Sequence, residues 1–210
     1  MQPKWLEWAK KIQALSQAGL TYTEGVFDRD RYLQLRDLAA EIMAAYSDTD
    51  LSIIKELFQQ QAGYPTPKVD VRGVVFKNGE MLLVREKLDG DRWTLPGGWA
   101  DANDTPAEAV TREVLEETGY PTRATKLLAC LDRNKQGHPP FPFHVYKLYF
   151  RCELLDETPV PHLHEHETGE SRFFREEELP ADISTGRVTA AQLHRFFEHF
   201  HQPDLPTDFD

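Results

Sequence analysis

The sequence predicts a sandwich of a mixed sheet and helices, of the α+β or α/β class, preceded by a small helical domain. Residues 1–64 carry apolar residues at three- and four-residue steps, which is the period of a helix with one buried face. The segment 63–67 holds two prolines, which exclude helix and mark a domain boundary. After Pro67, short strand patterns alternate with helical ones. We therefore expect a helical domain over 1–64 and a second domain over 65–210.

The helical domain is expected to begin with a helix near 4–18, for which Gly19 is the natural end. A second apolar pattern runs from Tyr32 to Tyr46, and a third runs from about Asp50 to Phe58. About 64 residues are few for a stable core of their own. The surplus apolar surface should therefore pack on the rest of the chain or on a second subunit, and we expect a homodimer.

Strand signals dominate after the boundary. Residues 69–76 alternate, Asn78-Gly79 predicts a hairpin turn, and 81–84 should pair back. Further strands are expected at 93–95, 125–131, 145–152 and 172–174. Helices are expected at 106–118 and after Thr189, because each start has a capping threonine with Glu or Gln three residues later.

Composition excludes several functional classes. Thirty-five acidic against 24 basic residues give a net charge of -11, and no basic patch is segregated, so we expect no nucleic-acid partner. No apolar run approaches the roughly 18 residues of a membrane span, and the start MQPKWLEWAK lacks a secretory pattern. Cys130 and Cys152 can support neither a disulfide framework nor a CxxC zinc motif. A cytoplasmic protein without a membrane partner is expected.

Three acids on one predicted helix carry the first chemical signal. At about 100° per residue, Glu113, Glu116 and Glu117 fall on one face, away from the apolar stripe of the same helix. Like charges at this spacing near a helix C-terminus are unfavourable. Hard cations such as Mg²⁺ or Mn²⁺ would offset that repulsion, since they prefer carboxylate oxygens. On the three acids alone, a solvated acidic surface is the more common case and the favoured interpretation.

The wider segment resembles the Nudix box, G-x5-E-x7-R-E-U-x-E-E-x-G-U, in which U is bulky and aliphatic. Gly98 opens it, Arg112-Glu113-Val114 and Glu116-Glu117 match its middle, and Gly119 closes it. Asp104 stands where the pattern has its first glutamate, and Tyr120 stands where an aliphatic residue is usual. The helices before the box, together with 67–73, are similar to a bacterial Nudix subgroup with a helical N-terminal extension, which includes CDP-choline and ADP-ribose pyrophosphatases.

The resemblance implies a Nudix-type α/β/α sandwich of the α+β class. It also implies a metal-dependent pyrophosphohydrolase of nucleoside diphosphate derivatives, of the ADP-ribose or CDP-choline type. Glu113, Glu116 and Glu117 would hold Mg²⁺ or Mn²⁺, helped by the Gly98 carbonyl. Members of the family differ in the base that activates water, so Glu113, Glu167 and Glu170 remain candidates, with Glu167 favoured. The shorter Asp104 leaves the orientation of Arg112 open.

Other residues are candidates for substrate contacts. Arg72 and Arg85 could bind a diphosphate through their guanidinium groups, although either could equally be a surface ion-pair partner. His144, beside Phe141 and Phe143, could line a pocket for the base or head group, but such aromatics are more often core. The histidines of 162–166 alternate in a loop, a pattern that fits a polar exposed loop better than a zinc site.

Two other functions stay open. A Nudix fold could serve as a ligand sensor without catalysis, and Asp104 is the box residue that favours this alternative. An enzyme that processes RNA could use the same metal chemistry, although the net charge of -11 argues against it. The sequence does not identify the X group.

Overall fold

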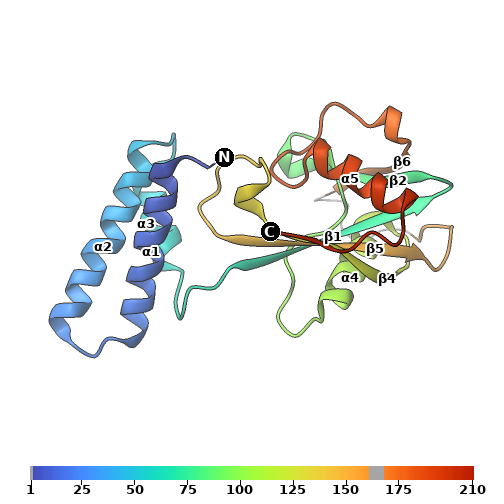
Figure 1. Ribbon diagram of the computed structural model, residues 1–210. Coiled ribbons are helices and arrows are strands. Elements are labelled where there is room, and N and C mark those ends of the chain that lie inside the picture. The colour runs from blue at the N-terminus through green and yellow to red at the C-terminus, as the bar shows by residue number, and fades with distance from the viewer. Residues whose placement is uncertain (1, 161–167) are drawn as a thin grey trace. The chain divides into compact units, whose positions relative to one another are not determined.

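The chain divides into two compact units in the computed structural model, which describes residues 2–160 and 168–210 (Figure 1). Residues up to Pro67 together with Pro140–His144 make up the helical unit, and Lys68–Pro139 with Val145–Asp210 make up the sheet unit. The segment 140–144 therefore belongs with the helices, although both of its neighbours in the chain belong to the sheet unit. That 1–64 and 65–210 are separate folding domains stays a prediction.

The helical unit is built from α1 (Lys4–Tyr22), α2 (Val26–Ala45) and α3 (Leu51–Gln59). Helices α1 and α2 lie side by side, joined by a short loop (Figure 1). Ala9 of α1 and Ala39 and Ala40 of α2 are fully buried, and such small side chains allow helices to pack closely. The buried core of this unit consists of Leu6, Ala9, Ala39, Ala40, Met43, Ile54 and Phe58.

The predicted end of the first helix at Gly19 is wrong, because α1 continues to Tyr22. A Cβ atom on Gly19 would lie 2.4 Å from the ring of Tyr32 in α2. One turn earlier, the Ser16 hydroxyl donates a hydrogen bond to the Tyr32 carbonyl. The glycine thus serves the packing of α1 against α2, and it does not terminate the helix.

The sheet unit contains a mixed sheet with strand order β3-β2-β1-β5-β4-β7, and β6 pairs with β2. The strands are β1 (Lys68–Lys77), β2 (Glu80–Glu86), β3 (Arg92–Thr94), β4 (Thr122–Asp132), β5 (Val145–Leu154), β6 (Thr168–Phe174) and β7 (Asp208–Phe209). Strands β1 and β5 run parallel, whereas β2 pairs antiparallel with β1, β3 and β6. The predicted hairpin at Asn78-Gly79 is confirmed, since both residues have positive φ, 53° and 83°.

Helices cover the two faces of this sheet, with α4 (Pro106–Thr118) on one side and α5 (Ala190–His201) on the other (Figure 1). Successive side chains of β1 point to opposite faces of the sheet, so this strand packs against both helical layers. Val71 and Val75 are buried against Val110 and Val114 of α4, whereas Val74 is buried in the cluster on the α5 side. The expected α/β/α sandwich is therefore confirmed.

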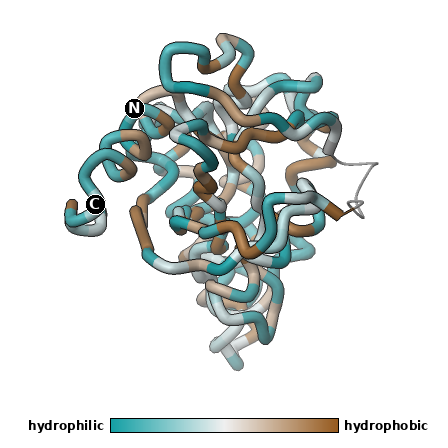
Figure 2. Tube along the Cα trace, turned by 90° about the vertical axis from the view of Figure 1, so that its right-hand side faces the viewer, coloured by the Kyte–Doolittle hydropathy of each residue, from teal (hydrophilic) through white to brown (hydrophobic). Residues whose placement is uncertain are grey.

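Hydrophobic residues are interspersed with hydrophilic ones along the tube (Figure 2). Within the residues described, no helix combines the length and the apolarity that crossing a membrane requires.

Candidate active site

Helix α4 is fixed at both ends by local sequence. Thr105 and Glu108 form a reciprocal capping box, and Pro106 occupies the first helical turn. Gly119 ends the helix in the left-handed conformation, with φ of 74°. The helix also lies close to β1, because a Cβ atom on Gly73 would be 2.4 Å from a methyl group of Val114. The direction of the helix, and hence of its acidic face, is set by these contacts.

The glycine loop that follows β3 is held against β1 by backbone hydrogen bonds. The Gly73 amide donates to the Pro96 carbonyl and the Val71 amide donates to the Gly98 carbonyl, both at 2.8 Å. Gly97 has φ of 140°, and a Cβ atom there would lie 2.1 Å from the Val71 carbonyl oxygen. Only glycine fits at this position.

The loop and the helix meet at Glu117. The Gly97 amide donates a hydrogen bond of 2.8 Å to the Glu117 carboxylate, which is only 7% exposed. Burial raises the pKa of Glu117 to about 8, and the nearby carboxylates of Glu113 and Glu86 add to the rise. Arg72 and the Gly97 amide oppose it. The charged form of this side chain therefore needs positive charge close by.

Glu113 lies beside the same loop. A Cβ atom on Gly98 would be 2.9 Å from a Glu113 carboxylate oxygen, so this glycine leaves the space that the carboxylate occupies. Burial raises the pKa of Glu113 above its ordinary value, although Arg112 works in the opposite direction. Gly98, Glu113 and Glu117 thus lie around the contact between the glycine loop and α4.

Arg112 binds three acidic side chains around α4, namely Asp104, Glu113 and Glu116. Its Nη1 donates to Glu113 and to Glu116, each at 3.0 Å. Its Nε donates to Asp104 at 3.1 Å. Asp104, despite its shorter side chain, therefore reaches the arginine that the box glutamate would be expected to support.

Hard divalent cations bind carboxylate and carbonyl oxygens, which are the donors present here. In the part of the chain that the structure describes, no three His, Cys, Asp or Glu side chains are grouped so as to hold a metal ion. The guanidinium of Arg112 instead bridges Glu113 and Glu116. The chemistry nevertheless fits, because these are carboxylate oxygens and the buried Glu117 requires a neighbouring cation to stay ionised. Gly98 has no side chain that would crowd the Glu113 carboxylate.

A buried charged cluster lies on β1 and β5, next to the glycine loop. Asp70 and Lys147 are direct partners in the parallel pairing of the two strands, and Lys147 Nζ lies 2.6 Å from the Asp70 carboxylate. Arg72 binds the same carboxylate through Nε and Nη2, at 3.0 and 2.8 Å, and its Nη1 donates to the Leu95 carbonyl. The predicted substrate ligand Arg72 is thus 4% exposed and hydrogen-bonded through all three nitrogens.

The pKa values of Asp70 and Lys147 reflect the ion pairs of this cluster. Burial alone would raise the pKa of Asp70, but Arg72 and Lys147 outweigh burial and lower it to about 2. Burial lowers the pKa of Lys147 to about 8, against the opposing effect of Asp70. Asp70 is therefore ionised at neutral pH and holds two buried cations near the Glu117 end of α4.

The other predicted arginine, Arg85, lies on β2. Its Nη1 donates to the Asp91 carbonyl and carboxylate at 2.7 and 3.1 Å, and its guanidinium stacks 4.7 Å from the ring centre of Trp93. Glu170, one of the candidate bases, has a carboxylate oxygen 3.9 Å from Arg85 Nε. The structure therefore brings Arg85 and Glu170 together, among acidic neighbours.

Two predicted site residues, His144 and Glu167, lie outside the described part of the sheet unit. His144 is exposed and belongs to the helical unit, whereas the box glutamates and both arginines belong to the sheet unit. Glu167, the favoured base, lies outside the described residues, as do the histidines of 162–166.

Sequence reasoning missed three buried charged residues of the site, namely Asp70, Glu86 and Lys147. Glu86 pairs with Arg187 at 3.0 Å and contributes to the raised pKa of Glu117. Asp70 carries a weak signal, since it shares a strand face with Arg72 two residues later. Lys147 is one of three charged residues on β5, with Arg151 and Glu153, and its partner lies 77 residues away in the sequence.

Comparison with known proteins assigns this chain to a family. Residues 66–195 match the NUDIX domain, and residues 3–58 match the UDP-X-like, N-terminal oligomerisation domain. A Bacillus subtilis (strain 168) protein with the provisional name ADP-ribose pyrophosphatase YjhB is 46% identical, with 100% of this chain and 99% of that protein covered.

Solved structures agree with this match. A UDP-X diphosphatase is 30% identical, with a TM-score of 0.61 and 98% of both chains covered. An ADP-ribose pyrophosphatase from Streptococcus suis 89-1591 is 35% identical, with a TM-score of 0.61, and covers 69% of this chain and 100% of its own. The chain belongs to the Nudix family. Within that family it is a pyrophosphohydrolase with a UDP-X-like helical domain at its N-terminus.

Proposed function

We propose that the protein hydrolyses the diphosphate linkage of a nucleoside diphosphate derivative of the ADP-ribose type, with Mg²⁺ or Mn²⁺ as its cofactor. The observation that carries this proposal is the buried Glu117 carboxylate, held by the Gly97 amide beside Glu113 at the end of α4. Two of the relatives above are named for ADP-ribose, which favours this substrate over CDP-choline, and one is named for UDP-X.

The divalent cation would neutralise phosphate oxygens and make the attacking water more nucleophilic. Glu113, Glu116 and Glu117 would bind it together with the Gly98 carbonyl, and Gly97 would orient Glu117. Water adds to one phosphorus, the bridging P–O bond breaks, and the products are a nucleoside monophosphate and phosphorylated X. Glu167 would accept the proton of the water, with Glu113 and Glu170 as the alternatives.

The arginines would have different roles in this proposal. Arg85 is partly exposed and could turn from Asp91 to the diphosphate, since guanidinium binds phosphate oxygens bidentately. Arg72 would act by its charge at the Glu117 end of the site, because its nitrogens already bind Asp70 and Leu95. His144 would contact the base or the head group.

Glu117→Gln is the decisive variant, because it removes a charge without changing shape. We expect roughly a 100-fold or greater loss of kcat. The assay separates products of ADP-ribose, UDP-sugars and CDP-choline by chromatography, with Mg²⁺, with Mn²⁺ and with chelator. Glu153→Gln is the matched control, since Glu153 is an exposed acid that pairs with Arg123 on the surface. Full activity of Glu117→Gln, or activity in chelator, would contradict the proposed metal role.

We also propose that the protein is a homodimer formed through its helical unit. Trp8, Leu15 and Tyr22 are 62%, 59% and 70% exposed and recur every seven residues, which places them along one face of α1. Large apolar side chains in such a row favour burial against a second copy. The description of the matching family as an oligomerisation domain supports this assembly.

A further inference from the structure

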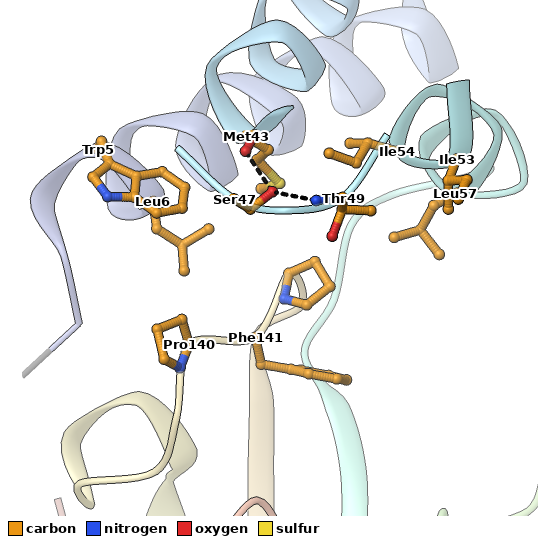
Figure 3. Close-up of a pocket in the computed structure, with 11 residues that line it drawn as sticks. Trp5, Leu6, Met43, Ser47, Thr49, Ile53, Ile54, Leu57, Pro140 and Phe141 are labelled. Atoms are coloured by element: carbon orange, nitrogen blue, oxygen red, sulfur yellow. Dashed lines mark hydrogen bonds between the residues drawn. The ribbon is translucent and has the colours of Figure 1, made fainter. Parts of the chain in front are cut away.

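The helical unit contains a cavity of about 190 Å³, and Leu6, Met43 and Ile54 are among the side chains that line it (Figure 3). Among the described residues, no charged side chain lines this cavity. It therefore offers no opposite charge to a diphosphate or to a metal ion. The buried charges of the sheet unit, in contrast, contact the chain at the start of the glycine loop.

Two successive peptide groups of the glycine loop are held from β1. The Pro96 carbonyl accepts a hydrogen bond from the Gly73 amide, and the N–H of the same peptide group donates to the Glu117 carboxylate. The preceding peptide group, between Leu95 and Pro96, has no N–H, because residue 96 is proline. Its carbonyl accepts a hydrogen bond of 3.2 Å from Arg72 Nη1. Strand β1 and the Arg72 side chain thus set the direction of the N–H that binds Glu117.

Asp70 fixes the guanidinium that makes this contact. Its two carboxylate oxygens accept hydrogen bonds from Arg72 Nε and Nη2, at 3.0 and 2.8 Å. A bidentate pair of this kind fixes the plane of the guanidinium, and Nη1 is then left to face the Leu95 carbonyl. Without Asp70, Arg72 would keep the hydrogen bond to that carbonyl, which also accepts from the Thr94 hydroxyl at 3.3 Å.

Asp70 also keeps Arg72 from pairing with Glu117. Arg72 lies close enough to Glu117 for their opposite charges to interact, yet its three nitrogens bind Asp70 and Leu95. A buried guanidinium that lost Asp70 would be left without an opposite charge, which is costly, and Glu117 is a carboxylate that could supply one. Such a new ion pair would occupy the oxygen atoms that a cation needs.

We propose that Asp70 is a positioning residue for the metal-binding carboxylate of Glu117. It acts through Arg72, which it holds against the Leu95 carbonyl and away from Glu117. This inference rests on the proposed function, because it takes Glu117 as a ligand of Mg²⁺ or Mn²⁺. Groups that orient a metal ligand typically contribute about 10- to 100-fold to metal affinity, so the effect is large enough to measure.

The test compares Asp70→Asn with Asp208→Asn in the full-length, substrate-free protein. Asp208 is a matched control, because it also binds an arginine through Nε and Nη2, namely Arg195 at 2.7 and 2.8 Å, and a second basic side chain, His199. It lies on β7, which β5 and β4 separate from β1 in the sheet. Mn²⁺ is titrated into each protein, and the free ion is measured by electron paramagnetic resonance. We expect the Kd for Mn²⁺ to rise about tenfold in Asp70→Asn and to stay within about twofold of wild type in Asp208→Asn.

Arg72→Lys provides a second variant. It keeps the positive charge, but a single ammonium group lacks the planar fork that binds Asp70 and the Leu95 carbonyl together. We expect a loss of Mn²⁺ affinity similar to that of Asp70→Asn. If circular dichroism shows that Asp70→Asn does not fold, Arg72→Lys decides by the same criterion. Wild-type affinity in the folded variants, or an equal loss in Asp208→Asn, would overturn the proposed role.

The Gly97 amide gives a measurement that needs no metal. Its exchange with solvent deuterium, followed by NMR, should be faster in Asp70→Asn than in Asp208→Asn, and equal rates would show that Asp70 does not hold the loop. If the wild-type protein bound no Mn²⁺, the metal role of Glu117 would fail, and the role of Asp70 would fail with it. If the wild-type protein bound Mn²⁺ but hydrolysed no nucleoside diphosphate derivative, the proposed function alone would fail, and the Kd values would still decide the role of Asp70.

Discussion

The surroundings of Asp70 depend on strand pairing that the local sequence does not reveal. It faces Lys147 because the parallel register of β1 and β5 makes the two residues direct partners. A pattern of alternating residues gives the face of a strand, but it does not give the register with a strand 77 residues away. The box glutamates were predicted, in contrast, because their spacing lies within one helix.

His138 provides a pH-dependent prediction at the same scale. Its Nδ1 lies 2.7 Å from the Thr185 carbonyl and donates to it. Its Nε2 is buried and has no hydrogen-bond partner among the described residues. Burial, reinforced by Lys147 and Arg133, lowers the pKa of His138 to about 4, although Thr185 and Asp70 favour the charged form. The folded protein thus holds this imidazole neutral.

Because an unfolded histidine binds its proton below about pH 6.5, unfolding takes up a proton between pH 6.5 and 4. The free energy of unfolding should therefore fall by about 2 kcal/mol as the pH drops through this window, after allowance for partial exposure. His138→Gln should lack that part of the pH dependence. Urea titrations of both proteins at pH 7.5, 6, 5 and 4.5 measure it, and parallel profiles would rule out the histidine as the source.

At the scale of elements, the predictions that succeeded rest on strong local signals. Both capping boxes and the Asn78-Gly79 turn gave element boundaries within a few residues. The predicted helix end at Gly19 was wrong because the sequence does not show whether a glycine ends a helix or makes room for a ring of a neighbouring helix. Strand β7 was not predicted, since its two residues depend on parallel pairing with β4.

The C-terminal end of α4 supports a prediction about Gly119. Its φ of 74° is left-handed, and a Cβ atom would lie 1.9 Å from the Val160 carbonyl oxygen. Gly119→Ala should lower the free energy of unfolding by about 3 kcal/mol or more, through strain and collision together. Gly137→Ala is the matched control, because Gly137 has φ of 76° with nothing within 4 Å of its Cβ position.

The control should cost only the conformational strain, about 1–2 kcal/mol. Thermal and urea unfolding followed by circular dichroism give both values. Equal losses for the two glycines would show that the chain around Val160 moves aside, and that the contact does not fix the end of α4.

At the scale of the whole molecule, the proposed dimer gives a prediction about mass. The wild-type protein should show twice the chain mass of 24.2 kDa in light scattering at micromolar concentration. Leu15→Glu should give the single chain mass, because a buried unpaired carboxylate is costly at an apolar contact. Gln60→Glu adds the same charge at an exposed position and should leave the dimer intact.

A monomeric wild-type protein would refute the proposed assembly, and a dimeric Leu15→Glu variant would move the contact to another face. The sequence predicted a dimer from surplus apolar surface alone. In the structure, an exposed apolar row lies on α1. Periodicity alone could not show this, because it does not distinguish a helix face that is buried within the chain from one that stays exposed.

The segment 140–144 also affects how the helical part of this chain could be cut off or replaced by that of a related protein. A single cut near residue 65 separates the sequence into a helical part and a remainder. That remainder would carry the segment 140–144, in which Phe141 and Phe143 had lost their contact with Lys10. A functional swap of N-terminal parts would thus have to transfer 140–144 together with the helices. The helical unit is discontinuous in the sequence, and a substitution at Lys10 would remove a contact to residues more than a hundred positions downstream.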